Sequence, residues 1–189
     1  MKKSLYSIFA LMAMLVAFTS CEKDEVENTA TVEAAGEWHI TFAAIDDNGE
    51  VIDDDWFGDG VYNIATSNTA ANVPNKMYIV DNVNYIVPYQ VEVDLDINNL
   101  TFKTNGEVEN MYGAGNLKPF FGEDIFLGER VTITDGKIIK DGYTKANGIK
   151  VDYIEFYISL SDDPLPGMYG IASKYKVSGF RYTGFVEDE

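Results

Sequence analysis

The chain has 189 residues, of which 31 are acidic and 14 are basic, so its formal net charge is −17 at pH 7. A charge of this sign argues against nucleic acid as a partner and against binding to anionic lipid headgroups through a basic patch. The single cysteine excludes a disulfide within the chain, so packing has to stabilise the core.

The first twenty residues have the pattern of a secretory signal. Lys2 and Lys3 form a positive segment, residues 5–18 are apolar, and Phe18-Thr19-Ser20 precedes Cys21. The apolar run is too short to span a membrane comfortably, and its end resembles the lipobox of bacterial lipoproteins. The resemblance implies cleavage before Cys21, acylation of that residue, and anchoring in the outer membrane with periplasmic or cell-surface display. The alternatives are an ordinary secretory peptide or a free thiol.

Residues 21–35 are expected to hold the lipidated cysteine and a flexible acidic tether, because Glu22–Ala35 is polar and has no periodicity. The start, Cys-Glu-Lys-Asp-Glu, resembles the export signal of surface-exposed lipoproteins of the Bacteroidetes, although a plain charged linker would look the same. Residues 36–189 are long enough for a single domain with its own core.

Alternation of apolar and polar side chains predicts an all-β domain. The first strand is expected at Gly36–Asp46, with Trp38 and Phe42 on one face. The clearest strand is Val87–Ile97, in which every odd residue is apolar and every even residue after Pro88 is polar or acidic. Further strands are expected at residues 61–67, 76–81, 100–104, 131–134, 137–140, 151–160 and 174–185.

Glycine dipeptides mark the expected changes of direction. Asp135-Gly136 predicts a two-residue hairpin, and Asp141-Gly142 indicates either another turn or a bulge in one longer strand. At Ser178-Gly179 the apolar residues change sides, which predicts a bulge or a sharp bend. Residues 161–167 must turn, and residues 105–123 form the longest irregular stretch. Eight or nine strands with short connections favour an antiparallel meander β-barrel of about eight strands over a β-sandwich.

Gly36-Glu37-Trp38 resembles the Gly-x-Trp signature of lipocalin-like (calycin) barrels. In those proteins an arginine from the end of the chain lies across the tryptophan and closes the base of the barrel. The resemblance implies that Gly36, Trp38 and Arg181 form this structural signature. The alternative is that Trp38 is an ordinary core residue and Arg181 a surface charge.

A broader resemblance covers most of the domain. Thr132–Asp163 and the ending Lys174–Glu189 are similar to a family of Bacteroidetes lipoproteins described as lipid-binding putative hydrolases. This resemblance implies a calycin barrel and lipid binding, but it defines no catalytic motif that could be carried over to this chain.

No motif in the sequence predicts catalysis, a metal or a cofactor. The single histidine, His39, is expected at the rim or exterior of the barrel, and there is no Gly-x-Ser-x-Gly elbow. A carboxylate pair that would act as a hydrolase stays open, because nothing selects one pair among 31 acidic residues. Asp53–Asp59 faintly resembles a calcium loop, but Ile64 stands where a bidentate glutamate is needed.

The favoured function is binding of a lipid or other small hydrophobic ligand without catalysis. The expected ligand-binding side chains lie inside the barrel and at its rim, namely Val91, Val93, Phe156, Ile158, Met111, Tyr112, Phe120 and Phe121. The alternative is a barrel filled by its own side chains. Other hypotheses are a glycan-binding accessory lipoprotein that stacks sugars on Trp56, Tyr62 or Tyr112, and an interaction subunit of an outer-membrane complex with unknown protein partners.

Overall fold

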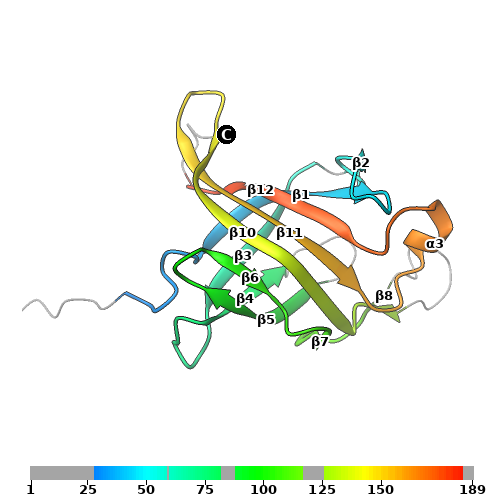
Figure 1. Ribbon diagram of the computed structural model, residues 1–189, viewed down its shortest axis with the longest axis horizontal. Coiled ribbons are helices and arrows are strands. Elements are labelled where there is room, and N and C mark those ends of the chain that lie inside the picture. Colours follow the sequence, from blue (N-terminus) through cyan, green and yellow to red (C-terminus); the bar gives the residue numbers. More distant parts are fainter. Residues whose placement is uncertain (1–27, 59, 82–87, 117–125, 185–189) are drawn as a thin grey trace, which may run out of the picture.

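The computed structural model describes residues 28–58, 60–81, 88–116 and 126–184, and eight antiparallel strands of this chain close into a barrel (Figure 1). Strands that follow each other around the wall pair in chain order, and the last strand returns to pair with the first. The predicted antiparallel meander barrel is therefore confirmed. The wall consists of β1 (Gly36–Ile45), β3 (Tyr62–Asn68), β4 (Lys76–Asp81), β5 (Tyr89–Asp96), β6 (Thr101–Lys103), β10 (Arg130–Thr144), β11 (Lys150–Leu160) and β12 (Tyr175–Arg181).

Short elements decorate this wall. β2 (Val51–Asp53) pairs with the end of β1, and β7 (Val108–Glu109) pairs with the start of β10. β8 (Gly115–Asn116) and β9 (Phe126–Leu127) pair with each other. The expected turn after β11 contains one short helix, α3 (Leu165–Tyr169), which the sequence pattern did not predict.

The interior forms because each strand buries alternate side chains. In β5, Tyr89, Val91, Val93 and Leu95 are 0–5% exposed, whereas the residues between them are half-buried or exposed. The other wall strands contribute in the same way, so one continuous apolar core runs through the barrel. Burying each large aliphatic side chain stabilises the fold by about 1.5–3 kcal/mol.

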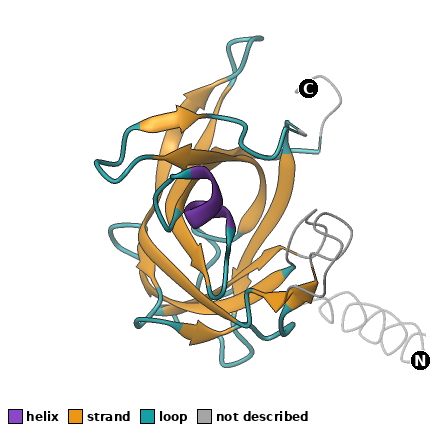
Figure 2. Ribbon diagram, turned by 90° about the vertical axis from the view of Figure 1, so that its right-hand side faces the viewer, coloured by secondary structure: helices purple, strands orange, loops and turns teal. Residues whose placement is uncertain are grey.

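The two ends of the barrel differ in how they are closed. We call the end that holds Gly36, Trp38 and Arg181 the base, and the opposite end, where β4 ends and β5 begins, the mouth. In Figure 2 the mouth faces the viewer, and α3 lies in front of the ring of strands. The loops that contain β2, β7 and α3 all lie at the mouth.

The predicted hairpin at Asp135-Gly136 is wrong, because β10 is one strand from Arg130 to Thr144. Its pairing with β11 shifts register between Thr134 and Lys137, and again between Ile139 and Tyr143, so both aspartate-glycine dipeptides lie at bulges. Asp135 has a φ of 54°, and a Cβ at Gly136 would lie 2.3 Å from the ring of Phe102. Within the strand, Asp135 therefore supplies a residue with left-handed backbone conformation, and Gly136 allows the close approach of Phe102, so the dipeptide forms a bulge and not a turn.

The bulge predicted at Ser178-Gly179 is also absent. β12 keeps an unbroken register with both of its neighbours. The apolar residues change sides because Phe180 packs on the outer surface, where its ring stacks on Tyr143 with centroids 4.6 Å apart. Gly179 faces β1 so closely that a Cβ would lie 1.9 Å from the carbonyl oxygen of His39.

Residues 28–35, predicted as part of a flexible tether, pack against the base. Thr31 and Ala34 are fully buried, and the Ala34 N–H donates to the Thr31 carbonyl at 2.8 Å. The domain therefore begins before Gly36, and the tether prediction is corrected for this segment. Residues 1–27, which include Cys21, lie outside the described residues.

We predict that Gly179→Ala lowers the free energy of unfolding by about 1–3 kcal/mol, because the new methyl group overlaps the backbone of β1. Urea denaturation followed by circular dichroism measures the change. Gly167→Ala in α3 is the control, since a Cβ there meets no atom within 4 Å. Equal stability of the two variants would contradict the close approach of β12 to β1.

Candidate functional site

The base is closed by Trp38 and Arg181. The guanidinium carbon of Arg181 lies 4.6 Å from the centroid of the Trp38 ring, which is a cation–π contact. The indole N–H donates to the Thr66 hydroxyl at 2.9 Å, and that hydroxyl donates to the Ala34 carbonyl at 2.6 Å. A Cβ at Gly36 would overlap the Arg181 guanidinium, so the glycine leaves the space that the arginine occupies.

Charged groups hold Arg181 in place over the ring. Its Nε and Nη2 atoms each lie 3.0 Å from Oδ2 of Asp152, and Lys140 lies 3.2 Å from the same oxygen. Burial by itself raises the pKa of Asp152, but the Asp141 N–H and the two cations lower it more, so the pKa is below its usual value. The base is thus sealed by a charged network and has a structural role.

The mouth is lined by aromatic rings. Phe42 contacts Phe57 and Tyr62, each with ring centroids 5.5 Å apart, and Phe57 contacts Tyr175 at 5.6 Å. These rings come from β1, β3, β12 and the loop after β2. They pack across the end of the barrel interior and form an apolar floor beneath the loops of the mouth.

Two polar side chains enter the interior at this end. Asp81 and Tyr89 are directly opposite each other on β4 and β5, and they are 0% and 1% exposed. The Tyr89 hydroxyl has no hydrogen-bond partner in the part of the chain that the structure describes. Burial and the negative charge of Asp81 raise the pKa of Tyr89 well above its ordinary value, so this hydroxyl stays neutral.

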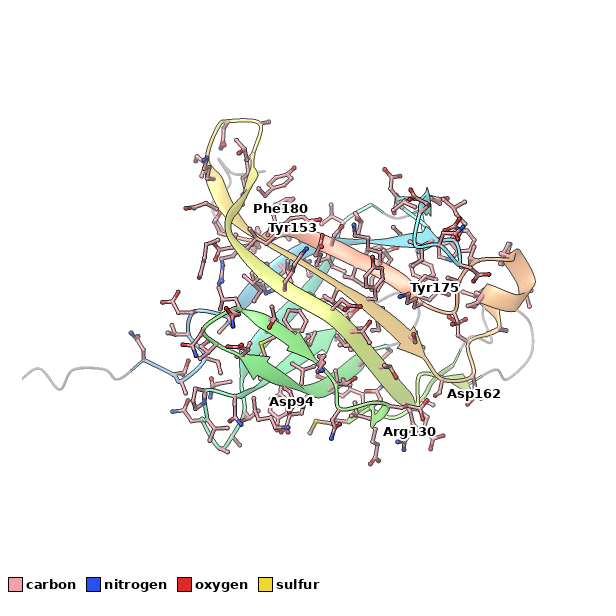
Figure 3. All side chains as sticks on the ribbon, in the orientation of Figure 1. Asp94, Arg130, Tyr153, Asp162, Tyr175 and Phe180 are labelled. Atoms are coloured by element: carbon pink, nitrogen blue, oxygen red, sulfur yellow. The ribbon has the colours of Figure 1, made fainter. Side chains whose placement is uncertain are left out.

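A third polar group at the mouth is already satisfied. The Tyr175 hydroxyl donates to Oδ2 of Asp163 at 2.6 Å, and the Asp163 Oδ1 atom accepts the N–H of Leu165 at the start of α3. Burial and this carboxylate both raise the pKa of Tyr175. The pair fixes α3 relative to β12, and Tyr175 is labelled on β12 in Figure 3.

The segment around Asn110 fixes one side of the mouth. The buried Asn110 amide donates to the carbonyls of Pro88, Gly113 and Gly128 at 2.8–3.0 Å. This clamp positions Met111 and Tyr112, the predicted rim residues, which are 57% and 47% exposed. Phe120 and Phe121, the other two predicted rim residues, lie outside the described residues.

The four predicted interior residues are all buried. Val91, Val93, Phe156 and Ile158 are 0–1% exposed and belong to the continuous core. Phe156 packs against Phe102 with centroids 5.7 Å apart, toward the base, whereas Val91 and Ile158 lie one step nearer to the mouth. In the described structure these side chains are packed against protein, so a ligand would meet the mouth before it reached them.

A groove of about 620 Å³ lies on the wall near the base, between β5, β6 and β10. Three carboxylates line it, those of Asp94, Asp96 and Asp135 (Asp94 is labelled in Figure 3). Asp94 lies 2.7 Å from Nζ of Lys76, and hydrogen bonds from Asn99 lower the pKa of Asp96 below its usual value. Asp94 therefore serves an ion pair on the wall, and Asp96 accepts hydrogen bonds in the turn that follows β5.

His39 lies on the outer face of β1, as the sequence predicts. Its ring stacks on Tyr182 with centroids 4.3 Å apart, and it lies 5.7 Å from Phe180. Phe180 and Tyr153 are opposite each other on β12 and β11, beside the long hairpin (Figure 3). The aromatic rings of this outer surface therefore pack in pairs, His39 with Tyr182 and Phe180 with Tyr143.

The residues proposed for glycan stacking are not arranged as one exposed surface. Tyr62 is 9% exposed and faces the interior, and half-buried Trp56 packs against Tyr169 at 5.4 Å. Within residues 28–58, 60–81, 88–116 and 126–184, no group of three or more possible metal ligands is close enough to hold an ion. In the same residues no helix has the length and hydropathy needed to cross a bilayer.

A family model described as "Lipid-binding putative hydrolase" matches residues 23–186. The chain belongs to this family. The match covers the whole barrel, from the segment that packs on the base to the end of β12. A search of curated proteins finds no match to this chain.

The polar groups of the mouth were missed from the sequence. Asp81 occupies an interior position of β4, two residues after Ile79 and four after Met77, so the alternation itself could have indicated a buried carboxylate. Tyr89 was recognised only as an apolar position. No sequence pattern placed the exposed apolar residues of β2 and α3 at the mouth, because neither element was predicted.

We predict that Arg181→Met lowers the free energy of unfolding by about 1–2 kcal/mol, because the cation–π contact with Trp38 and the hydrogen bond and ion pair with Asp152 are lost. Urea denaturation measures this change. Arg130→Met is the matched control, since the ion pair of Arg130 with Glu107 is solvent-exposed and should contribute little. If both variants lose the same stability, the contact at Trp38 is not what holds the base.

Proposed function

We propose that this protein is a membrane-anchored lipoprotein whose barrel binds a lipid or another small hydrophobic ligand at the mouth and does not catalyse a reaction. The family to which the chain belongs carries lipid binding in its description, which supports the class of ligand. The geometry of the mouth supports the proposed position of the ligand.

The observation that carries this proposal is the distribution of exposed apolar side chains. Among the described residues, seven of the eleven large apolar side chains with high exposure lie at the mouth. Scattered exposed apolar residues are normal, but a concentration at one end marks a site for an apolar partner. The seven are Val51, Ile52, Val61, Met111, Tyr112, Met168 and Tyr169.

The packed interior limits how the ligand is held. The rings of Phe42, Phe57 and Tyr175 form a floor below the mouth, so an apolar chain would lie on this floor and under the rim. The aromatic floor below the ligand and the rim above it would together shield the ligand from water. Such burial contributes about 25 cal/mol for each Å² of apolar surface removed from water.

The absence of catalysis is supported by how the candidate groups are engaged. His39 packs among aromatic rings on the outer face, and Asp94 and Asp96 serve in an ion pair and a turn. None of these groups lies at the mouth, so a ligand held there would not meet a general acid or base among them.

Anchoring is proposed from the sequence around Cys21. If Cys21 is acylated, residues 22–27 form the link to the first described residue, and six extended residues reach about 20 Å. The packed segment that follows them lies at the base, so the mouth would be at the end of the barrel far from the anchor (Figure 1). Two or more acyl chains would make this attachment stable.

The mouth is tested by replacing two rim residues. Met111→Glu/Met168→Glu should reduce co-purified lipid at least about fivefold, because charges replace apolar contacts at the rim. Native mass spectrometry of the full chain purified from its own membrane measures the lipid adducts.

Ile139→Glu/Ile149→Glu is the control, because it adds the same charges at exposed apolar positions near the base. It should leave the lipid adducts unchanged. Reproducible absence of lipid from the wild type, or an equal loss in both double variants, contradicts binding at the mouth.

The anchor is tested by Cys21→Ala. We expect the variant to move from the membrane fraction to the soluble fraction and to lose the mass of its acyl chains, which membrane fractionation and intact mass spectrometry measure. Ser20→Ala is the control, since a small residue before the cysteine keeps the signal. Retention of Cys21→Ala in the membrane fraction would show that another feature attaches the protein.

A further inference from the structure

The end of the barrel beside the proposed anchor carries a second set of exposed apolar side chains. Among the described residues, the large exposed apolar side chains that do not lie at the mouth are Val32, Ile139, Tyr143 and Ile149, which are 38–47% exposed. Val32 belongs to the N-terminal segment that packs on the base, and the other three lie on the hairpin of β10 and β11. The base therefore has an apolar surface of its own, separate from the mouth.

The hairpin of β10 and β11 extends past the wall at the base. The pairing of β12 with β11 ends at Tyr153, and the pairing of β6 with β10 ends at Lys137, whereas β10 and β11 stay paired as far as Thr144 and Lys150. In Figure 1 the hairpin (yellow) and the N-terminal segment (blue) both lie on the left, at the end opposite α3. A two-stranded ribbon thus projects from the base with apolar side chains on it.

Contacts with the rest of the domain hold this ribbon in place. The ring of Tyr143 stacks on Phe180 with centroids 4.6 Å apart, and the Lys145 amine lies 5.3 Å from the centroid of the same Phe180 ring. Nζ of Lys140 lies 3.1 Å from Oε2 of Glu33, which joins the hairpin to the segment that contains Val32. The hairpin and the N-terminal segment therefore present a preformed surface.

Charge distinguishes this surface from the mouth. The described mouth loops, residues 46–58, 60–61, 107–116, 126–130 and 161–174, contain eleven acidic and two basic residues. Residues 139–152 of the hairpin contain three basic and two acidic residues, in a chain whose formal net charge is −17. An anionic surface is therefore repelled by the loops of the mouth but not by the hairpin.

The residue types on the hairpin suit the boundary between lipid headgroups and acyl chains. Tyrosine prefers this boundary because its ring is apolar and its hydroxyl is polar, and isoleucine buries apolar area there. Lys150 is exposed at the end of the ribbon, where its amine can reach phosphate groups while its methylene stem lies along apolar surface. A surface of this kind, small and mixed in character, binds a bilayer weakly by itself.

The proposed anchor makes a weak contact sufficient. Residues 22–27 reach about 20 Å from Cys21 to the segment at the base, so an acylated Cys21 keeps this end of the domain close to the bilayer. A tethered surface meets its partner at a high effective concentration, so it needs little affinity of its own.

We propose that the hairpin of β10 and β11 docks on the bilayer that holds the acylated Cys21, with Ile139, Tyr143 and Ile149 in the headgroup region. This inference rests on the anchor of the proposed function and adds a second membrane contact to it. The anchor alone lets the domain turn freely, whereas the docked hairpin fixes its orientation. The mouth is then held away from this bilayer, and its ligand is exchanged on the aqueous side.

The test places a fluorophore at either end of the domain. Cys21 is the only cysteine of the chain, and its acylated sulfur does not react, so Ala146→Cys on the hairpin and Asp54→Cys at the mouth each supply one thiol at an exposed position. The acylated full-length protein is reconstituted in vesicles of phosphatidylethanolamine with about a quarter of phosphatidylglycerol. A quencher attached to the lipids should quench the label at Ala146→Cys at least about threefold more strongly than the label at Asp54→Cys.

Two pairs of substitutions identify the residues that dock. Ile139→Glu/Ile149→Glu should remove most of the quenching at Ala146→Cys, because charges replace the apolar contacts of the hairpin. Met111→Glu/Met168→Glu is the matched control at the mouth and should leave this quenching unchanged. Circular dichroism verifies that each variant is folded. Lipid adducts at the mouth should respond to the same two variants in the opposite way.

The outcomes separate this inference from the proposed function. Equal quenching at the two labels, or quenching that survives Ile139→Glu/Ile149→Glu, overturns docking by the hairpin, while the lipid adducts still measure binding at the mouth. A signal at Ala146→Cys that grows with protein density and resists the lipid quencher assigns the surface to a second copy of the chain and also overturns docking. If the unsubstituted chain takes up the label, Cys21 is a free thiol, and the anchor and the docking fail together.

Discussion

The pairing of the first strand with the last is the contact on which the barrel depends. β1 and β12 are separated by most of the chain, and their seven paired positions turn a curved sheet into a closed wall without free edges. Gly179 permits the close approach of the two backbones, and Arg181 then lies across Trp38. Without this closure the alternating faces of the strands would have no common interior.

Closure gives the two ends of the barrel different chemistry. At the base, Asp152 forms ion pairs with Lys140 and with Arg181, and Arg181 lies over the Trp38 ring, so charged groups cover the apolar core. At the mouth the core ends in aromatic rings, a polar pair and exposed apolar side chains. Under the proposed function, a base that is held by many contacts leaves the opposite end as the place where a ligand would be exchanged.

The strand pattern predicted the fold well because alternation depends only on local geometry. The segment Val87–Ile97 was assigned as a half-buried strand, and β5 buries the odd residues as expected. The hairpin prediction at Asp135-Gly136 failed because the same dipeptide is compatible with a hairpin turn and with a bulge. Only the pairing of β10 with β6 and β11 distinguishes the two. The helix α3 is a single turn and is too short to show periodicity.

The candidate site was predicted less completely than the fold. Val91 and Phe156 were correctly placed in the interior, but the sequence did not indicate that protein side chains pack tightly around them. Asp81 and Tyr89 could be assigned to inward positions, yet their opposition depends on the register between β4 and β5. The ring of exposed apolar residues at the mouth joins segments that are far apart in the chain.

By itself the amino-acid sequence determined which side of the long wall strands is apolar and the approximate number of strands, and its resemblance to calycin barrels implied that a glycine, a tryptophan and an arginine meet at the base. Only the tertiary structure decided which strands are continuous, which residues face each other across the wall, and that a buried carboxylate and an unbonded hydroxyl share the mouth. The physical reason is that side-chain direction is set within a few residues, whereas pairing register and burial are set by contacts between distant segments.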